Sequence, residues 1–410
     1  MHKPAILGGE PVSKKKIRFA KIFVGDEERK AIEEILREGS LVSGAYLEKF
    51  EKEFARFIGA KHAIAVSNGT DALFLSYLAL DLTFGSRVLT TPFTFVATAS
   101  SIIHAGSIPL FADVLEDGNL DPASVEKMFS REKIDAITVV HMYGKPVEMD
   151  EIRRIAREKG ALVIEDAAHA HGAEYKGTKV GLLGDIAAFS LYPTKIIAAG
   201  GWGGVIVTND DEVAEKLTLL RAHGELRHKL GEAGAYEYER LGYNMRMSHI
   251  EAAVAYYQLK RINTYIEKRR KIAKMLNELL GDLPGIRVPE EPNHLKHVYY
   301  IYSILIDEKV IGWSRDEFVK ALNAEGVEAR RGYHKPLHKQ ELFLNINDPR
   351  VNHFAKIHKY PEYAKMHLPN AERISQKTVW LPMHPFLTEE EVESIATAVR
   401  KLIEWKSTHA

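Results

Sequence analysis

Short apolar runs alternate with amphipathic stretches between about residues 60 and 210 of the chain. Runs that are rich in Val and Ile and bounded by turn residues predict β-strands. They are Ala63–Val66, Ala136–His141, Leu162–Glu165, Ile186–Ser190 and Val205–Thr208. Strands and helices in alternation predict an α/β domain with a mostly parallel sheet that is covered on both faces.

The helices predicted between these strands have recognisable ends. Asp121-Pro122 is typical of an N-cap and first helical position before Ala123–Phe129, and Glu148–Lys159 stops at Gly160. The stretch Asp71–Leu80 is apolar nearly all round, which is typical of a helix buried on all sides.

The pattern changes after residue 247. Neither Gly nor Pro occurs between Ser248 and Leu280, which predicts one long helix that links two domains. Capping boxes predict helix starts at Ser248–Glu251, Ser314–Glu317 and Thr388–Glu391. Near the start, Asp26 is expected to cap a helix that ends before Gly39. We therefore expect an irregular arm over 1–25, a large α/β domain over 26–261 and a small α+β domain over 262–410.

The composition excludes several classes of function. With 56 basic and 56 acidic residues, the chain lacks the basic field that binding to nucleic acid requires. Its lack of cysteine excludes disulfides, iron–sulfur clusters, thiolate zinc sites and a cysteine nucleophile. Val88–Ala112 has no charged residue but contains two prolines, which favours buried interior over a membrane helix. No secretory pattern is visible, so a soluble cytoplasmic protein is expected.

The motif SNGTDAL, residues 67–73, is the first candidate for chemistry. It stands between a predicted strand and a buried helix, and the free N–H groups at a helix N-terminus favour phosphate. The alternative is an Asn-Gly turn that only reverses the chain.

The motif IEDAAHAHG, residues 164–172, places Asp166 at the C-terminal end of a central strand, where open α/β sheets bind ligands. A carboxylate there can hold a metal, act as a base, pair with a cationic ring nitrogen or cap a turn. His169 and His171 could bind the same metal ion as Asp166. The sequence shows no further cluster of ligands for such an ion, and we expect no metal.

Lys195 is the only charged residue between Asp185 and Asn209. Such a lysine either reaches solvent or is desolvated, which lowers the pKa of its amine and makes it nucleophilic. A phosphate cradle, an Asp for a pyridinium nitrogen and a Schiff-base lysine are together what pyridoxal phosphate requires. Phe95 would supply an aromatic face for the ring.

With these motifs, the chain resembles the DegT/DnrJ/StrS family of pyridoxal-phosphate sugar aminotransferases. Matching segments run in the family's order from about residue 20 to 405, among them SNGTDAL, IEDAAHAHGA, FSLYPTK, GGWGGVIVTND, GYNMRMSHIEAA and LPMHP. The resemblance implies the fold-type I architecture, with a mostly parallel seven-stranded sheet in the large domain. It also implies a homodimer with shared active sites.

The resemblance further implies a role for each matching position. Lys195 would form the internal aldimine with pyridoxal phosphate, Asp166 would pair with the pyridinium nitrogen, and His169 would lie near the ring hydroxyl. The residues implied to stack on the ring or to hold the phosphate are Phe95, Gly69, Thr70, Ser190 and Asn244, the last reaching the neighbouring subunit. The weaker candidates for substrate contact are Arg246, Tyr333 and His334.

The implied reaction is a two-stage transamination. Glutamate or glutamine would convert the cofactor to pyridoxamine phosphate, which would then aminate a keto-sugar, nucleotide-linked or free, or a keto-cyclitol. Ile196, Trp202 and residues 226–240 depart from the family's pattern near the expected substrate mouth, which leaves the identity of the substrate open.

Four alternatives remain open. A dehydratase of the same family would carry His in place of Lys195, whereas an aromatising relative would look similar overall. A non-catalytic sensor that binds pyridoxal phosphate would not need Lys195, Asp166 and the phosphate residues together. A metal hydrolase would use histidines from two segments, namely His169, His171, His334 and His338.

Overall fold

The computed structural model describes residues 2–42, 44–82 and 84–409. Its largest sheet has the strand order β1-β9-β8-β5-β4-β2-β3, in which β8, β5, β4, β2 and β3 run parallel and β9 is antiparallel to both neighbours. The predicted α/β class and mostly parallel sheet are therefore confirmed. The strands are β1 (His62–Val66), β2 (Arg87–Thr90), β3 (Ile108–Phe111), β4 (Ala136–Val140), β5 (Leu162–Asp166), β8 (Ile186–Ser190) and β9 (Gly204–Thr208).

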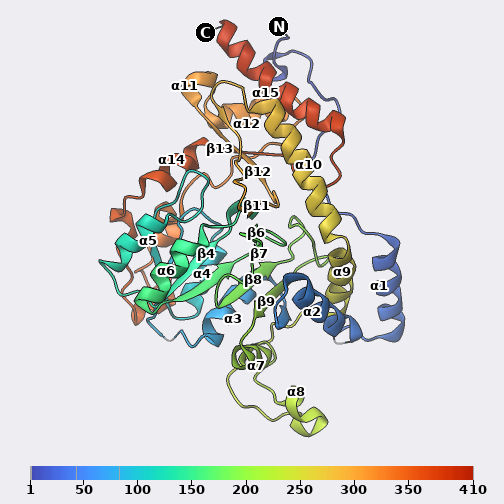
Figure 1. Cartoon of the computed structure of the whole chain (residues 1–410), viewed down its shortest axis with the longest axis vertical. Helices are drawn as coiled ribbons and strands as arrows, with labels where there is room; N and C mark the ends of the chain where they lie inside the picture. The colour runs from blue at the N-terminus through green and yellow to red at the C-terminus, as the bar shows by residue number, and fades with distance from the viewer. Residues whose placement is uncertain (1, 43, 83, 410) are drawn as a thin grey trace.

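Helices cover both faces of this sheet (Figure 1). On β1, Ala63 and Ala65 join one core while Ile64 and Val66 join the other, as the two-residue period of a strand requires. One face carries α3 (Gly69–Ala79), α4 (Ala97–His104) and α7 (Asp211–Leu220). The other carries α2 (Ala45–Ile58), α5 (Pro122–Phe129), α6 (Met149–Lys159) and α9 (His249–Lys260).

Several predicted helix starts are confirmed, and one is wrong. The Ala123 N–H donates to Asp121 Oδ1 (3.0 Å) at α5, and the three predicted capping boxes form. Helix α1 (Asp26–Glu38), however, is capped by Gly25, and Asp26 is its first helical residue. The Glu28 carboxylate accepts from the Gly25 N–H (3.0 Å), so glutamate rather than Asp26 closes this end.

The long helix expected over 248–280 is interrupted at Arg261. Its φ of −100° separates α9 from α10 (Ile262–Leu280). The Arg261 guanidinium donates to Glu27 and Glu28 of α1. The break therefore coincides with a tertiary contact, which the absence of Gly and Pro could not indicate.

The C-terminal part has its own antiparallel sheet, β10-β12-β13. Its elements are α10, β10 (Ile286–Arg287), β12 (Tyr302–Ile306), α11 (Glu308–Ile311), α12 (Arg315–Ala324), α14 (Pro369–Lys377), β13 (Thr378–Leu381) and α15 (Glu389–His409). Ile17 of the N-terminal arm pairs with Val327 and is buried in this core. In contrast, Phe343 and Tyr363 pack on Phe111 of the large sheet. The proposed domain limits stay a prediction.

Short elements complete the fold. A third sheet has β6 (Glu174–Tyr175) in its centre, paired with β11 (Leu295–Lys296) on one side and with β7 (Thr178–Lys179) on the other. Helices α8 (Arg227–Leu230) and α13 (Glu341–Leu344) are single turns, and α8 lies on an arm that projects from the body (Figure 1). The 3₁₀ turns are Ala5–Leu7, Met142–Gly144, Gly231–Gly234, Leu337–Lys339, His353–Lys356 and Tyr363–Lys365. No helix in the described ranges is long and apolar enough to cross a membrane.

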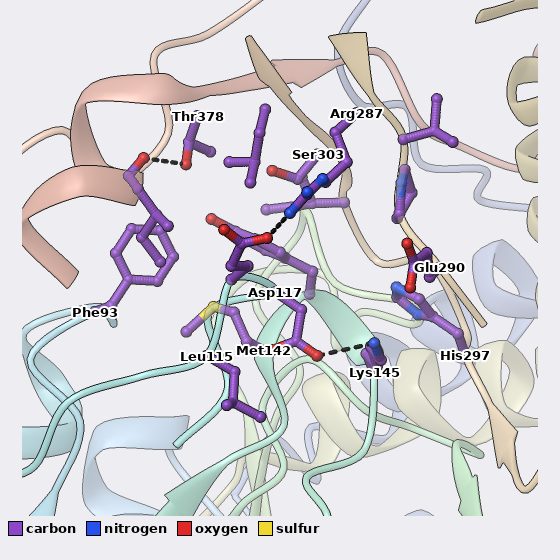
Figure 2. Close-up of a pocket in the computed structure, with 17 residues that line it drawn as sticks. Phe93, Leu115, Asp117, Met142, Lys145, Arg287, Glu290, His297, Ser303 and Thr378 are labelled. Atoms are coloured by element: carbon purple, nitrogen blue, oxygen red, sulfur yellow. Dashed lines mark hydrogen bonds and ion pairs between the residues drawn. The ribbon is translucent and has the colours of Figure 1, made fainter. Parts of the chain in front are cut away.

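A cavity of about 360 Å³ lies between the large sheet's loops and the small sheet (Figure 2). Its cationic side chains are already paired with acids. Lys145 Nζ lies 2.8 Å from Asp117 Oδ2, and the Arg287 guanidinium contacts Glu116. Glu116 also pairs with Arg373 of α14 (2.9 Å), so these charges join the two parts of the chain and leave no unpaired cation for an anionic ligand.

Candidate active site

A larger cavity, of about 890 Å³, opens at the carboxyl ends of β5 and β8. This edge of a parallel sheet is where ligands bind in open α/β folds. Most sequence-predicted site residues line it, namely Gly69, Thr70, Phe95, Asp166, His169, Ser190, Lys195 and Tyr333. Residues of the small sheet and its flanks, including Trp380, form the opposite wall.

The motif SNGTDAL folds as a capped helix start. Asn68 Oδ1 accepts from the Asp71 N–H (2.9 Å), so α3 begins at Gly69 beside Ser190. A Cβ on Gly69 would lie 2.7 Å from Ser190 Cβ, so only glycine fits this approach. The N–H groups of a first helical turn have no partner inside their helix. Gly69 and Thr70 therefore present N–H donors to the cavity next to the Ser190 hydroxyl.

Asp166 ends β5 at the floor of the cavity and is 5% exposed. Thr98 Oγ1 donates to its Oδ2 (2.7 Å), and the Ala168 N–H donates to its Oδ1 (3.2 Å). Burial raises the pKa of the Asp166 carboxyl. No cationic side chain in the part of the chain described pairs with it, so this buried carboxylate would be stabilised by a cation that enters the cavity.

Lys195 follows β8 on a half-buried loop. Its N–H donates to the Tyr192 carbonyl (2.8 Å), and buried Ile196 and Ile197 lie behind it. The amine lies 4.5 Å from the centroid of the Tyr300 ring. Tyr300 is itself held by a hydrogen bond of 3.0 Å between its hydroxyl and Thr194 Oγ1. The lysine thus lines the cavity, and no carboxylate among the described residues forms an ion pair with its amine.

The two histidines of the motif IEDAAHAHG have different surroundings. His169 lines the cavity, its ring centroid lies 4.5 Å from that of Tyr300, and its Nδ1 has no hydrogen-bond partner. Burial and the nearby Lys195 hold the pKa of His169 well below its ordinary value, so the ring is neutral. His171 instead packs against Phe54 and Phe189 in the core.

Three sequence candidates lie outside the residues that line the cavity. His334 is exposed, although Tyr333 beside it lines the cavity. Asn244 and Arg246 are exposed and bonded to each other, with Arg246 Nη2 donating to Asn244 Oδ1 (3.0 Å). None of these three side chains is among the residues that line the cavity with Lys195.

The metal-hydrolase alternative finds no support in this geometry. His338 bonds to Glu372 (3.0 Å) rather than to His169 or His171. No group of three or more potential ligands capable of holding a metal occurs among residues 2–42, 44–82 and 84–409.

The family model of the DegT/DnrJ/EryC1/StrS aminotransferases matches residues 23–400. The chain belongs to this family. It is an aminotransferase with the fold-type I architecture that the sequence implied.

Three relatives illustrate the family. The spore coat polysaccharide biosynthesis protein SpsC of Bacillus subtilis is 35% identical over 93% of this chain and 95% of its own. The UDP-N-acetyl-3-dehydro-alpha-D-glucosamine 3-aminotransferase of Acidithiobacillus ferrooxidans is 33% identical over 92% and 94%. The crystal structure of DesV from S. venezuelae with a ketimine intermediate superposes with a TM-score of 0.85 at 31% identity, over 95% of this chain and 99% of that one.

Several cavity residues of this aminotransferase escaped the sequence reasoning. Thr98, Tyr192, Tyr300, Arg330 and Trp380 all line the cavity. Thr98 belongs to the segment TPFTFVATAS and Tyr192 to the motif FSLYPTK that contains Lys195, so their places could have been inferred from the resemblance. Tyr300, Arg330 and Trp380 lie in segments without a recognisable motif, and only the fold brings them to Lys195.

Proposed function

We propose that this aminotransferase uses pyridoxal phosphate to move an amino group from glutamate or glutamine to a nucleotide-linked keto-sugar. The observation that carries the proposal is that the Lys195 amine and the unpaired, buried Asp166 carboxylate face one cavity beside the N-terminus of α3. The name of the Acidithiobacillus relative, which specifies a UDP-linked keto-sugar, supports the acceptor class.

The residues present fit the cofactor. The N–H groups of Gly69 and Thr70 and the Ser190 hydroxyl would bind its phosphate, because a helix start favours an anion. Asp166 would hold a proton on the nitrogen of the cofactor ring. The Nδ1 atom of neutral His169 has no hydrogen-bond partner and would be free to bond to a polar group on that ring. Bound pyridoxal phosphate supplies an electron sink for the bond that breaks at the donor's Cα.

Lys195 has two roles in this proposal. Its Nζ would hold the cofactor through the aldehyde group, and when the donor amine takes that place, the freed Lys195 amine would carry the proton that leaves the donor's Cα. Hydrolysis by water would release the donor as a keto acid and leave its amino group with the cofactor. Tyr300, whose ring centroid lies 4.5 Å from the Lys195 amine, and Phe95 both line the cavity in which this chemistry would take place.

Two exposed aromatic side chains at the mouth support an acceptor with a planar ring. Trp202 is 62% exposed and Tyr192 is 42% exposed, yet both line the cavity and their ring centroids lie 5.4 Å apart. Such surfaces stack on nucleobases with little sequence preference, at about 1–3 kcal/mol for each base.

Replacing Trp202 should therefore weaken acceptor binding. We expect Trp202→Ala to raise the KM for the nucleotide-linked acceptor about 5- to 150-fold, the equivalent of that stacking energy. Trp202→Phe should keep most of the affinity, and the reaction with the amino donor alone should not change in either variant. An unchanged acceptor KM in Trp202→Ala would remove Trp202 from the acceptor site.

We also propose that the active unit is a homodimer. Asn244 is exposed and is not among the residues that line the cavity of its own chain, and two side chains from the preceding segment, Tyr236 and Leu241, are 79% and 85% exposed. Mixing Lys195→Ala subunits with Asn244→Asp subunits should restore one intact site in each hybrid dimer. The proposal would be contradicted if light scattering gave the molar mass of a single chain in solution and the mixed subunits showed no activity.

The direct test of the function is amino transfer by the purified holoenzyme. Glutamate and glutamine are supplied in turn with UDP-, GDP- and dTDP-linked keto-sugars, free keto-sugars and a keto-cyclitol, and the amino product is identified by mass spectrometry. Amination of a nucleotide-linked member alone supports the proposal. Amination of only free sugars or cyclitols would overturn the acceptor class, and no transfer at all would overturn the function.

A further inference from the structure

We propose that a small cavity behind Lys195 binds one monatomic anion of the size of chloride. The cavity measures about 10 Å³, and Lys195 lines both it and the active-site cavity. Several segments meet there, namely the arm at 21–23, the loop at 195–198, the helix pair α9 and α10, and the turn at 385–386. The inference does not depend on the proposed function, because it concerns an ion that joins parts of the fold rather than a substrate.

Arg269 of α10 contributes a buried positive charge that has no acidic partner. It is 2% exposed, and its Nη1 donates to three main-chain carbonyls, those of Tyr299 (3.2 Å), Tyr300 (3.2 Å) and Met383 (3.0 Å). Its Nε is buried without a hydrogen-bond partner, and no carboxylate in the described residues forms an ion pair with the guanidinium. Burial lowers the pKa of Arg269 to about 10, so the group is still charged at neutral pH. A buried charge is unfavourable unless it is paired, so this guanidinium favours an anion beside it.

Neighbouring groups that line the same cavity add hydrogen-bond donors. The Tyr265 hydroxyl is buried and has no partner. The main-chain N–H groups of Ile196, Ile197 and Ala198 have no acceptor among the described residues, although these residues are at most 3% exposed. Buried N–H groups are nearly always paired. One species that accepts several hydrogen bonds satisfies these donors together.

The charges around the cavity favour an anion over a water molecule. Among the described residues that line it, Lys21, Lys195 and Arg269 are cationic and none is acidic. Glu28, which bonds to one lining side chain, is already paired with Arg261. A water molecule has two hydrogens of its own to donate and offsets no charge, whereas an anion can accept from every donor present.

The size of the cavity selects the kind of anion. A volume of about 10 Å³ holds one water-sized species, which excludes phosphate, sulfate and carboxylate groups. Chloride is monatomic, only slightly larger than a water molecule, and releases its hydration shell more readily than fluoride does. We therefore assign the site to chloride.

An anion at this position connects the two parts of the chain around the reacting lysine. It accepts from the loop that carries Lys195 and from Arg269, whose Nη1 also holds the Tyr300 carbonyl. The Tyr300 ring lies 4.5 Å from the Lys195 amine. The ion therefore fixes the main chain that carries the lysine and, through Arg269, the main chain that carries its aromatic neighbour.

Hydrogen exchange of the holoenzyme tests the site in solution. A peptide that spans residues 196–198 is followed by mass spectrometry in sodium chloride and in sodium gluconate, because gluconate has the same charge but is too large to enter. Exchange should slow about tenfold once chloride exceeds its Kd about tenfold, since the amides are free only while the ion is away. Over the same range, the unfolding temperature should rise by about 1–4 °C more in chloride than in gluconate.

Two substitutions connect these effects to the named donors. Arg269→Gln removes the buried charge and should abolish the chloride dependence of both measurements. Tyr265→Phe removes one donor with little change in volume and should raise the chloride concentration for half the effect about 3- to 10-fold, which tests the site even if Arg269→Gln does not fold. Arg270→Gln is the matched control, because Arg270 pairs with Glu291, donates to the His297 carbonyl (2.9 Å) and does not line the cavity. Its chloride dependence should equal that of the wild type.

Bromide identifies the ion directly. Crystals of the holoenzyme grown in sodium bromide should give one anomalous peak between Arg269 and the loop at 195–198. Density for a water molecule without an anomalous signal would overturn the proposal. Equal exchange rates and unfolding temperatures in chloride and gluconate would overturn it even with such a peak, which would then be an adventitious ion only. Chloride dependence that persists in Arg269→Gln would place the ion elsewhere and so contradict the assignment.

Discussion

Lys195→Ala should abolish amino transfer while leaving the protein folded. General acid–base catalysis by a positioned side chain contributes about 10²–10⁴-fold, and this variant also loses the covalent attachment, so we expect kcat to fall at least about 10⁴-fold. Lys195 is half-buried on a loop, and no ion pair or side-chain hydrogen bond in the described residues depends on its amine. The midpoint of thermal unfolding should therefore shift by only a few degrees.

Borohydride reduction followed by intact-mass measurement tests the assignment. Wild-type protein should gain the mass of one reduced cofactor, and Lys195→Ala should bind the cofactor without fixing it. Lys179→Ala is the matched control, because burial lowers the pKa of Lys179 but its amine donates to the Phe57 carbonyl, outside the cavity. Cofactor fixed to Lys195→Ala, or lost from Lys179→Ala, would show that another lysine is the nucleophile.

The sequence could predict those elements that are determined by interactions between residues close together in the chain. The cap at Asp121 and the box at Ser248 need only a few neighbouring residues, and both form as expected. The charge-free stretch Val88–Ala112 folds as interior, with β2, α4 and β3. The strands β2 and β3 were not separately predicted, because Pro92 and Pro109 obscure the strand pattern in a segment that is mostly buried.

What the sequence could not predict depends on contacts between distant segments. The antiparallel β9, which lies between β1 and β8, carries the same apolar pattern as the parallel strands of the sheet, so its direction is set only by the connection between Ser190 and Gly204. Tyr300 and Arg330 reach the cavity from beyond α10, more than a hundred residues after Lys195. No local motif marks them, since their role arises from how the small sheet packs over the large one.

Replacing Asp166 should separate the stability of the protein from its activity. Asp166→Asn keeps the shape of the side chain and can still accept from Thr98, but it cannot stabilise a proton on the cofactor ring nitrogen. Breaking a buried charge pair costs roughly 3–5 kcal/mol, so we expect kcat to fall about 10²- to 10⁴-fold in the cofactor-loaded protein. Thr98→Val, which removes one hydrogen bond of 2.7 Å to the carboxylate, should cost about tenfold or less.

The protein without cofactor should respond in the opposite direction. Burial raises the pKa of Asp166 above that of the unfolded chain, so the folded state binds the proton more tightly. This group therefore stabilises the fold most at low pH, and the stability falls as the pH rises through the folded-state pKa. At neutral pH, cofactor-free Asp166→Asn should consequently unfold at the same or a higher temperature than wild type, and its stability should fall less as the pH rises above the ordinary pKa of an aspartate. A large fall in its unfolding temperature would show that Asp166 already has a cationic partner in the empty cavity.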